Sequence, residues 1–416
     1  MRILIRAALL LISFVSTSQN CNNSVSGKVS DLHDGSLLSG ATLVFSEINK
    51  TVQTDIEGYY MISDLCEDEV YIIEILHPSC ETMRFRLKVS GNMKRDFKLE
   101  HHIEALNEII VSGKVYEENS SSVFENKVTS ETLEKFSTAS LGDALKSLSG
   151  VSSLNKGNGI VKPVINGLHS SRIIMINNGV RMQDQEWGKE HAPNIDVNAI
   201  GRLTVVKSAS ALQYGGDAMG GIVIAEGLKV PVKDTLYGKT MLSGASNGRG
   251  GVLTSQLTKS HKNGWYGTAQ GTLKRFGDVE SADYVMSNTG LMEKDLSLRL
   301  GLNRFNHGLE AYYAYYNTEI GILRSSHAHS PSDQIRAINS NIPLVVRDFT
   351  YDIDYPSQDV KHHLARIKAF KKFNDFGKLS FQYDYQNNRR LEFDIRRGDD
   401  RDTPALDLKL NTHTIL

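Results

Sequence analysis

The carboxyl-terminal part of the chain, from about residue 236, is dominated by long runs in which apolar and polar residues alternate. A period of two places successive side chains on opposite faces of a β-strand. The runs approach the roughly 9–11 residues that a tilted membrane-spanning strand needs. A soluble sheet with one wet face explains any single run, but several long strands in succession without helices favour a barrel. The clearest runs are Trp265–Leu273, Leu296–Asn303 and Lys378–Tyr385.

Residues 1–18 have the pattern of an export signal. Two arginines precede an apolar run from Ala7 to Val15, and the small residues Ser16–Ser18 offer a cleavage site. The run is shorter than the roughly 20 apolar residues of a membrane-spanning helix. A lipid anchor on Cys21 is the alternative, which the polar residues before that cysteine disfavour. Later stretches are less apolar still, so a membrane location requires a barrel or a surface anchor.

Charge and cysteine content exclude some classes of function. Lys plus Arg total 47 and Asp plus Glu total 48, which gives no electrostatic basis for binding nucleic acid. The three cysteines are Cys21, Cys66 and Cys80, and no CxxC pair supports a zinc site. An exported chain meets an oxidising compartment, so we expect one disulfide and one remaining thiol, with the pairing open.

Residues 19–100 read as short strands separated by turns, which is typical of a small β-sandwich. The stretch resembles the carboxypeptidase-regulatory-like domain, through Ser26–Val29, Gly40–Thr42 and Asp55–Tyr60. The resemblance implies an immunoglobulin-like or transthyretin-like sandwich. No peptidase site accompanies it.

Residues 101–122 are polar, with one apolar island at Ile109–Val111 and an acidic, serine-rich linker after it. Such an island is either a buried strand or a strand that adds to the sheet edge of a partner.

Residues 123–232 form a mixed α/β unit. Ser140 predicts a helix start, with Asp143 in the first turn and Gly150 at the end. Asn177–Gly179 predicts a hairpin turn after a short buried strand. The glycines near residues 215–221 are not a phosphate-binding loop, because the spacing is wrong and no Lys-Ser/Thr follows. The expected buried strands are Ile173–Ile176, Leu203–Val206 and Ile222–Ile224.

From Leu106 onward, about three quarters of the chain resembles the TonB-dependent outer-membrane receptors, especially those of Bacteroidetes type. The order of the matching stretches is more specific than any one of them. They are Leu106–Gly113, Leu141–Leu145, Leu148–Val151, Pro163–Leu168, Arg172–Met182 and Ile200–Ala225.

Two positions depart from the family pattern. The family commonly has Arg where Asn166 stands and Asp where Asn178 stands. Both departures remove a charge that we expect inside the plug, so ion-pair detail is not carried over from the family.

The resemblance implies a mainly β fold with three parts: the small sandwich, an α/β plug and the first part of a transmembrane β-barrel. The expected boundaries are 1–18 signal, 19–100 sandwich, 101–122 TonB-box segment and linker, 123–232 plug, and 233–416 partial barrel. Barrels of about 22 strands are wide enough to need a plug. They need about 200 residues for strands alone, by the roughly 9–11 residues each strand takes, whereas 184 follow position 232. We therefore expect a fragment or a truncated product.

The mechanism implied by the resemblance is energised import across the outer membrane. A scarce ligand binds outside, and a periplasmic segment adds as a strand to TonB. The inner-membrane complex that energises TonB transmits proton-motive force, while the barrel is embedded in outer-membrane lipid. The amino-terminal domains are periplasmic or within the barrel. No substrate bond changes, so we expect neither enzyme activity nor a cofactor. The expected TonB-contacting residues are Leu106, Asn107, Glu108, Ile109, Ile110, Val111 and Ser112.

A metal ion, a metal chelate or a siderophore is the favoured ligand. The stretch from Trp187 to Asp196 sits where a plug apex loop is expected and resembles a loop of receptors linked to metal uptake. His327 and His329 lie in an expected extracellular loop and could ligate zinc or copper; the alternative is that they are ordinary polar loop residues. Ligand-binding candidates are Arg181, Trp187, Glu190, His191 and Asp196.

Three other functions remain open. The importer could carry glycans or peptides, or the chain could be a non-transporting adhesin or binding protein of the outer membrane. An adhesin has no reason to carry the Leu106–Ser112 segment. A metalloenzyme using His327 and His329 requires a third ligand and a general base in a cleft, and the sequence contains no motif of that kind.

Overall fold

The computed structural model describes residues 21–416 apart from 33–34, 79, 101–123, 158, 184, 186–187, 189, 208–210, 212–213, 229, 231–232, 327–329, 374–376, 396–399 and 401. The chain divides into two compact units, Met1–Ile103 and Glu104–Leu416. The predicted export signal and the predicted TonB-contacting segment lie outside the described residues.

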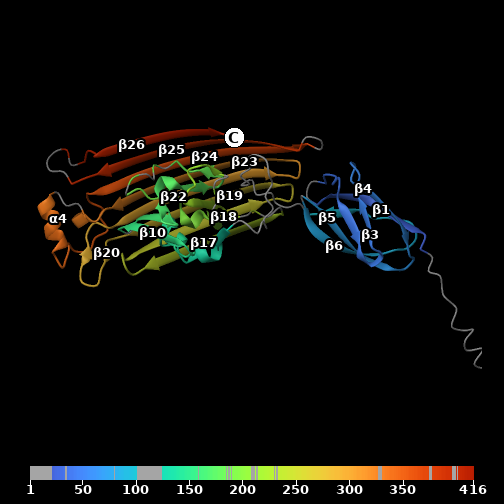
Figure 1. Ribbon diagram of the computed structural model, residues 1–416, viewed down its shortest axis with the longest axis horizontal. Coiled ribbons are helices and arrows are strands. Elements are labelled where there is room, and N and C mark those ends of the chain that lie inside the picture. Colours follow the sequence, from blue (N-terminus) through green and yellow to red (C-terminus); the bar gives the residue numbers. More distant parts are fainter. Residues whose placement is uncertain are drawn as a thin grey trace, which may run out of the picture. The chain divides into compact units, whose positions relative to one another are not determined.

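The first unit is a sandwich of two small sheets, as predicted (Figure 1). In β1 (Asn23–Asp31) every second residue from Val25 onward is buried, which is the pattern of a strand with one face on a core. A disulfide joins Cys21 to Cys66, and Cys80 is buried in β6. One sheet contains β4 (Tyr59–Leu65), β1 (Asn23–Asp31), β7 (Met93–Lys94) and β8 (Phe97–Leu99), and the other contains β3 (Lys50–Gln53), β2 (Thr42–Phe45), β5 (Val70–His77) and β6 (Cys80–Lys88), with η2 at Ser46–Ile48.

The second unit begins with the mixed α/β part, called here the plug. Its main sheet runs β14-β13-β16-β15-β9, with β13 and β16 parallel, and a smaller sheet runs β10-β11-β12. The strands are β9 (Phe124–Thr129), β10 (Val151–Lys156), β11 (Ile160–Ile165), β12 (Leu168–His169), β13 (Ile173–Asn177), β14 (Val180–Arg181), β15 (Arg202–Lys207) and β16 (Gly221–Glu226). The short helices are α2 (Ser130–Glu134), α3 (Leu141–Leu145), η3 (Ser170–Arg172) and η4 (Val197–Ala199).

Local signals in the plug act as the sequence indicates. Ser140 caps α3 in a reciprocal capping box with Asp143. The helix ends at Leu145, before the end that the sequence predicted at Gly150. Asn178 and Gly179 both have positive φ, at 48° and 79°, as the turn between β13 and β14 requires.

The rest of the second unit is an antiparallel sheet of eight strands, called here the wall. Its order is β17-β18-β19-β22-β23-β24-β25-β26, so each long strand pairs with its neighbours along the chain. Figure 1 shows the plug, in green, against these strands. The strands are β17 (Thr235–Ala245), β18 (Gly250–Ser260), β19 (Trp265–Phe276), β22 (Leu291–Asn303), β23 (His307–Gly321), β24 (Ser357–Phe373), β25 (Gly377–Phe393) and β26 (Leu406–Ile415), with a small hairpin of β20 (Val279–Glu280) and β21 (Val285–Met286).

The polarity of the two wall faces is the reverse of that in a soluble sheet. The exposed face is apolar, and the face that meets the plug is buried and polar. A soluble sheet buries its apolar face instead, so the wall has the partition of a membrane barrel. Exposed apolar residues include Leu257, Trp265, Leu273, Leu298, Leu300, Ile367, Leu379 and Phe381, and buried polar residues include Gln270, Thr272, Lys274, Glu293, Asp295, Glu310, His362, Arg366, Gln386 and Arg390.

A helix occupies part of the connection between β23 and β24, where the sequence predicted a plain loop. It is α4 (Pro331–Ile338), which follows η6 (Arg324–Ser326). Ser330 caps α4 by accepting from the Asp333 amide, and Pro331 stands in the first turn. Among the described residues, α4 and the other helices are all too short or too polar to cross a membrane.

Candidate functional site

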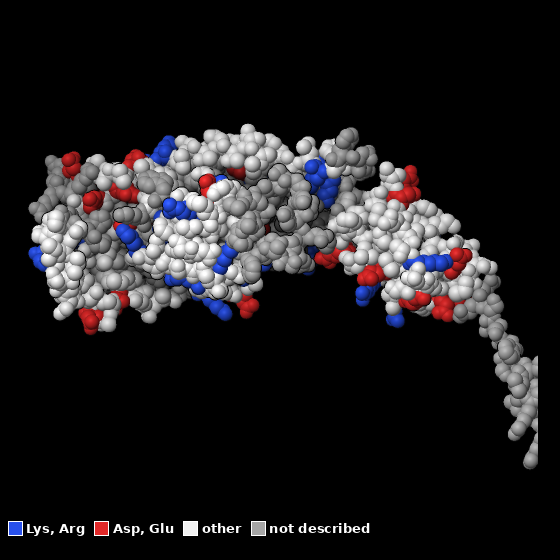
Figure 2. All heavy atoms as spheres, viewed as in Figure 1, with Lys and Arg blue, Asp and Glu red and all other residues white. Residues whose placement is uncertain are grey.

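The predicted ligand-binding residues fall into two groups. Trp187, His327 and His329 lie outside the described residues. The other four, Arg181, Glu190, His191 and Asp196, are on the plug and do not form one cluster. On the face seen in Figure 2, acidic and basic side chains are interspersed over the plug and wall.

His191 ties the plug loop to the wall. It is 4% exposed. Its Nε2 lies 2.6 Å from Oε1 of Glu392 at the end of β25, and its Nδ1 faces the Gln185 carbonyl oxygen. A Cβ on Gly188 would lie 2.4 Å from the imidazole ring, so the loop needs glycine there. Both ring nitrogens are thus engaged, and its predicted contact with a ligand stays a prediction.

Glu190 and Arg181 make ion pairs within the plug. Glu190 accepts a hydrogen bond from the Lys156 ammonium at 2.9 Å, and this contact joins the plug loop to β10. Arg181 pairs with Asp217 at 2.6 Å, and both side chains are largely exposed. Exposed pairs of this kind contribute little stability, about 0–1 kcal/mol.

Asp196 is a buried carboxylate that joins the plug to β19. It caps η4 by accepting from the Asn198 amide at 2.9 Å. Its second oxygen accepts from Gln270 Nε2 at 2.9 Å and from Thr272 Oγ1 at 2.7 Å. Desolvation, reinforced by the charge of Glu293, raises the pKa of Asp196 above its usual range.

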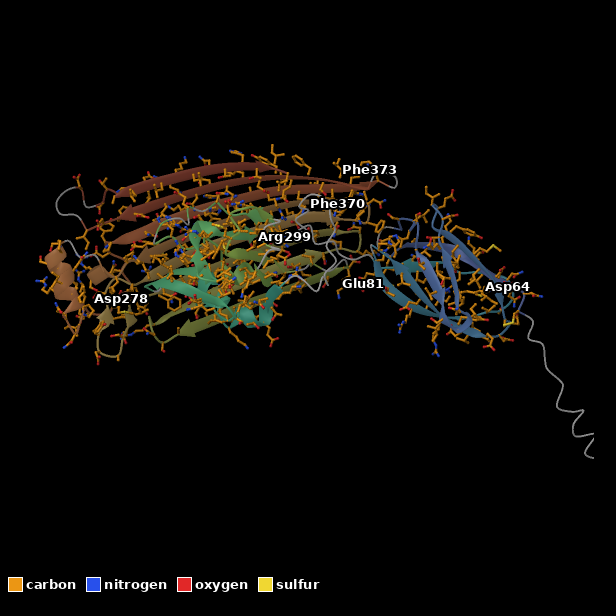
Figure 3. All side chains as sticks on the ribbon, in the orientation of Figure 1. Asp64, Glu81, Asp278, Arg299, Phe370 and Phe373 are labelled. Carbon is orange, nitrogen blue, oxygen red and sulfur yellow. A yellow bond between two sulfur atoms is a disulfide. The ribbon has the colours of Figure 1, made fainter. Side chains whose placement is uncertain are left out.

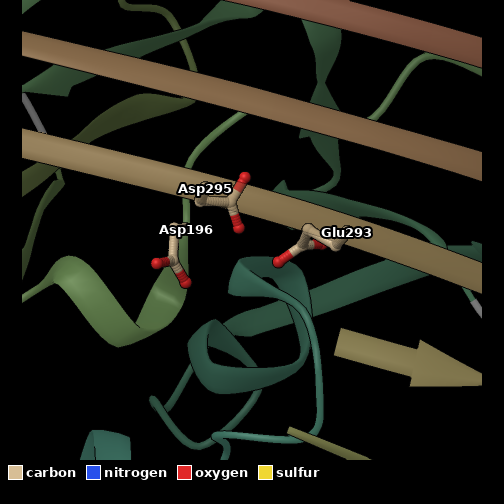
Figure 4. Close-up of side chains that lie close together, drawn as sticks. All are labelled: Asp196, Glu293 and Asp295. Atoms are coloured by element: carbon tan, nitrogen blue, oxygen red, sulfur yellow. The ribbon is translucent and has the colours of Figure 1, made fainter. Parts of the chain in front are cut away.

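Two wall residues complete a carboxylate cluster with Asp196. Glu293 and Asp295 are two apart on β22 and share its inner face, and one oxygen of each residue lies within 4.8 Å of the others (Figure 4). Lys274 of β19 is the nearest cation, with Nζ 3.1 Å from Glu293 Oε1 and 3.1 Å from the Ala139 carbonyl oxygen of the plug. Clustered carboxylate oxygens are a donor set for hard divalent cations.

A second polar network surrounds the turn at Asn178. Its Nδ2 donates to Tyr312 Oη at 3.0 Å, while its Oδ1 accepts from the Gly227 amide and from Arg299. Arg366 of β24 donates to the Asn178 carbonyl oxygen and to the Glu310 carboxylate. Arg299, labelled in Figure 3, therefore reaches the plug from β22.

The two departures from the family pattern have different surroundings. Asn178 is buried, and an amide there serves as both donor and acceptor, while Glu310 supplies the negative charge beside the arginines. Asn166 is exposed on the turn between β11 and β12, at a φ of 50°. The expectation that both lie inside the plug is therefore wrong for Asn166, because a tight turn holds it at the plug surface.

Sequence reasoning missed the wall's contribution to these networks. None of Glu293, Asp295, Glu310 and Arg366 was predicted as a site residue. A usable signal was present, because a plug that fills a barrel buries charged residues of the inner face, and buried charges are costly unless they are paired.

Comparisons with known proteins agree with this architecture. A family model described as the TonB-dependent receptor plug domain matches residues 117–222, and one described as a CarboxypepD_reg-like domain matches residues 25–111. The vitamin B12 transporter BtuB of Photobacterium profundum is 29% identical over 97 residues, which are 23% of this chain and 16% of that protein.

Solved structures share the fold at low sequence identity. The copper transporter OprC superposes with a TM-score of 0.52 at 15% identity, over 70% of this chain and 42% of that chain. The ferric enterobactin receptor PfeA superposes with a TM-score of 0.50 at 11% identity, over 71% of this chain and 46% of that chain. The chain thus spans less than half the length of these relatives, and the likeness concerns the fold.

Proposed function

Because this chain carries the plug domain and the barrel-wall fold of TonB-dependent receptors, we propose that it belongs to an outer-membrane importer of a scarce ligand. Import uses proton-motive force that TonB and its inner-membrane complex relay. The protein moves its ligand without changing a bond in it, so the function is transport and not catalysis.

The observation that carries this proposal is the reversed polarity of the wall. Leu298, Leu300 and Phe381 stand on its exposed face, whereas Gln270, Arg366 and other polar groups are buried against the plug. The exposed apolar face is compatible with the hydrocarbon core of a membrane. The buried polar face supports a lumen that the plug fills.

The ligand class we favour is a metal ion, a metal chelate or a siderophore. The copper and ferric enterobactin named for two structural relatives, and the vitamin B12 named for the sequence relative, support this range. We place contact with the ligand on the plug apex loop that includes Trp187 and Glu190, and on His327 and His329. Glycans and peptides are the alternative cargo.

Deleting Leu106–Ser112 from the complete receptor tests the mechanism. We expect uptake to fall to the background of a strain that lacks the gene, because the strand that TonB would pair with is gone. Binding of ligand to whole cells is expected to persist, since the plug and wall are untouched. A matched control deletes seven residues of the linker after Gly113.

Uptake that survives the deletion would contradict the energised importer. Growth of a gene-deletion strain under zinc, copper or iron limitation, and on glycans as carbon source, then identifies the cargo. A defect confined to glycans would replace the metal proposal with the alternative cargo.

A further inference from the structure

The carboxylate cluster at the seam between plug and wall holds more acidic groups than cations. Asp196, Glu293 and Asp295 are 7%, 6% and 8% exposed. Lys274 is the cation among them, and its ammonium lies 3.1 Å from Glu293. When all three carboxyl groups are ionised, they and one ammonium sum to a charge of −2, and burying such an excess without a further cation or a bound proton is costly.

Asp196 and Asp295 of the cluster border a small cavity. Its volume is about 20 Å³, enough for one water-sized sphere or ion, and its lining includes Asp196, Asp295, Gln270, Tyr316 and His362. Apolar side chains, among them Ile195, Leu296 and Leu364, complete the lining, so the cavity is of mixed polarity. An apolar void would stay dry, whereas the carboxyl groups and the imidazole of this lining offer partners to a bound polar species.

Two buried atoms at this cavity have no hydrogen-bond partner among the described residues. They are Oδ2 of Asp295 and Nε2 of His362. Both side chains are more than nine-tenths buried, and His362 belongs to a different strand from the carboxylates. An orphaned carboxylate oxygen in a water-sized cavity is the group that a bound cation satisfies.

The strand register explains why these groups meet. Thr272, Asp295, Tyr316 and His362 are directly opposite one another across β19, β22, β23 and β24. The row therefore runs across the inner face of the wall, and the plug brings Asp196 to it through Gln270 and Thr272.

We propose that the carboxylate cluster binds one divalent cation of the Ca²⁺, Mg²⁺ and Mn²⁺ class. Carboxylate and hydroxyl oxygens are the ligands that these hard ions prefer. One such ion neutralises the net charge of −2 and links Asp196 of the plug to Glu293 and Asp295 of the wall. The ion has a structural role, in that it holds the plug against the wall, and it is distinct from the transported ligand.

Binding to the full-length protein in detergent tests the proposal. After treatment with chelator, we expect one Mn²⁺ per chain by electron paramagnetic resonance, displaced by Ca²⁺ or Mg²⁺. Asp295→Asn is expected to weaken Mn²⁺ binding by about tenfold or more, because it removes a charged ligand while keeping the side-chain shape. Asp283→Asn, on an exposed loop, is the matched control and is expected to bind like the unaltered protein.

A second measurement covers the case in which Asp295→Asn fails to fold. In the unaltered protein, Mn²⁺ or Ca²⁺ should slow amide hydrogen exchange of the segment from Asn194 to Ile200, which holds Asp196. Exchange that is the same with and without the ion would overturn the proposal, as would binding that Asp295→Asn leaves intact.

Zinc bound in preference to Mn²⁺, with dependence on His362, would also overturn it, since a nitrogen-based site is then present. Failure of cation binding with normal uptake removes this inference alone. Loss of the energised-importer mechanism is instead read from the Leu106–Ser112 deletion.

Discussion

At the residue scale, single side chains of the plug form hydrogen bonds with side chains of the wall. His191 reaches Glu392, Asn178 reaches Tyr312 and Asp196 reaches Thr272, each across more than seventy positions of sequence. These contacts are buried or half-buried, where an unmade hydrogen bond is expensive. Polar contacts thus hold the plug to the wall beside an apolar cluster that includes Ile160 of the plug and Phe276 and Ile320 of the wall.

The His191–Glu392 contact is testable by a double-mutant cycle. We expect His191→Ala to lower the free energy of unfolding by about 1–3 kcal/mol, as for a hydrogen bond to a charged group. Glu392→Gln removes the charge with little change in shape, and the double variant should show coupling above about 0.5 kcal/mol. Denaturant unfolding measures the stability of the unaltered protein, the two single variants and the double variant. Additive effects would show that the two side chains act independently.

At the element scale, sequence patterns work where neighbours on the chain decide the structure. The alternation in β22 and the capping box of α3 are relations between residues two or three apart, so they were predicted. The helix α4 was missed, although Ser330, Pro331 and Asp333 carry a start signal. The length of the expected loop outweighed that local signal.

The depth of a wall strand in the membrane gives a graded prediction. Leu298 lies near the middle of β22 and Leu236 near the start of β17, and both are exposed. Leu298→Lys is expected to cost about 2–4 kcal/mol, and Leu236→Lys about 0–1 kcal/mol, because a charge near the midplane is the farthest from water. Reversible unfolding from lipid vesicles measures both, and equal costs would contradict the assigned depths.

At the scale of the whole molecule, the plug and wall form one compact unit, joined by polar contacts and by an apolar cluster of Ile160 with Val252 and Ile320. Ser137 of the plug and Ser243 of β17 approach with their hydroxyl oxygens 3.0 Å apart. This contact lies at one edge of the wall sheet, and the contact of His191 with β25 lies near the other edge. The plug therefore contacts the described sheet near both of its edges.

A cross-link between these serines tests whether import requires the plug to move. In the complete receptor, the pair Ser137→Cys and Ser243→Cys should form a disulfide, because the two side chains already meet. We expect uptake to stop in the oxidised form and to return after reduction, with each single variant as control. Import by the cross-linked form at the normal rate would show that the plug stays fixed to β17 during transport.

The sequence by itself determined the order of parts, the strand alternation and the turn at Asn178, because each depends on backbone geometry and on residues within a few positions. It also determined that the strands of the wall have one apolar and one polar face, while the structure decided that the apolar face is the exposed one. Only the tertiary structure decided which distant groups meet: the plug carboxylate of Asp196 with Glu293 and Asp295, and the Asn178 turn with Arg299 and Arg366. Those meetings depend on strand register and on the seating of the plug, which are cooperative properties of the whole sheet.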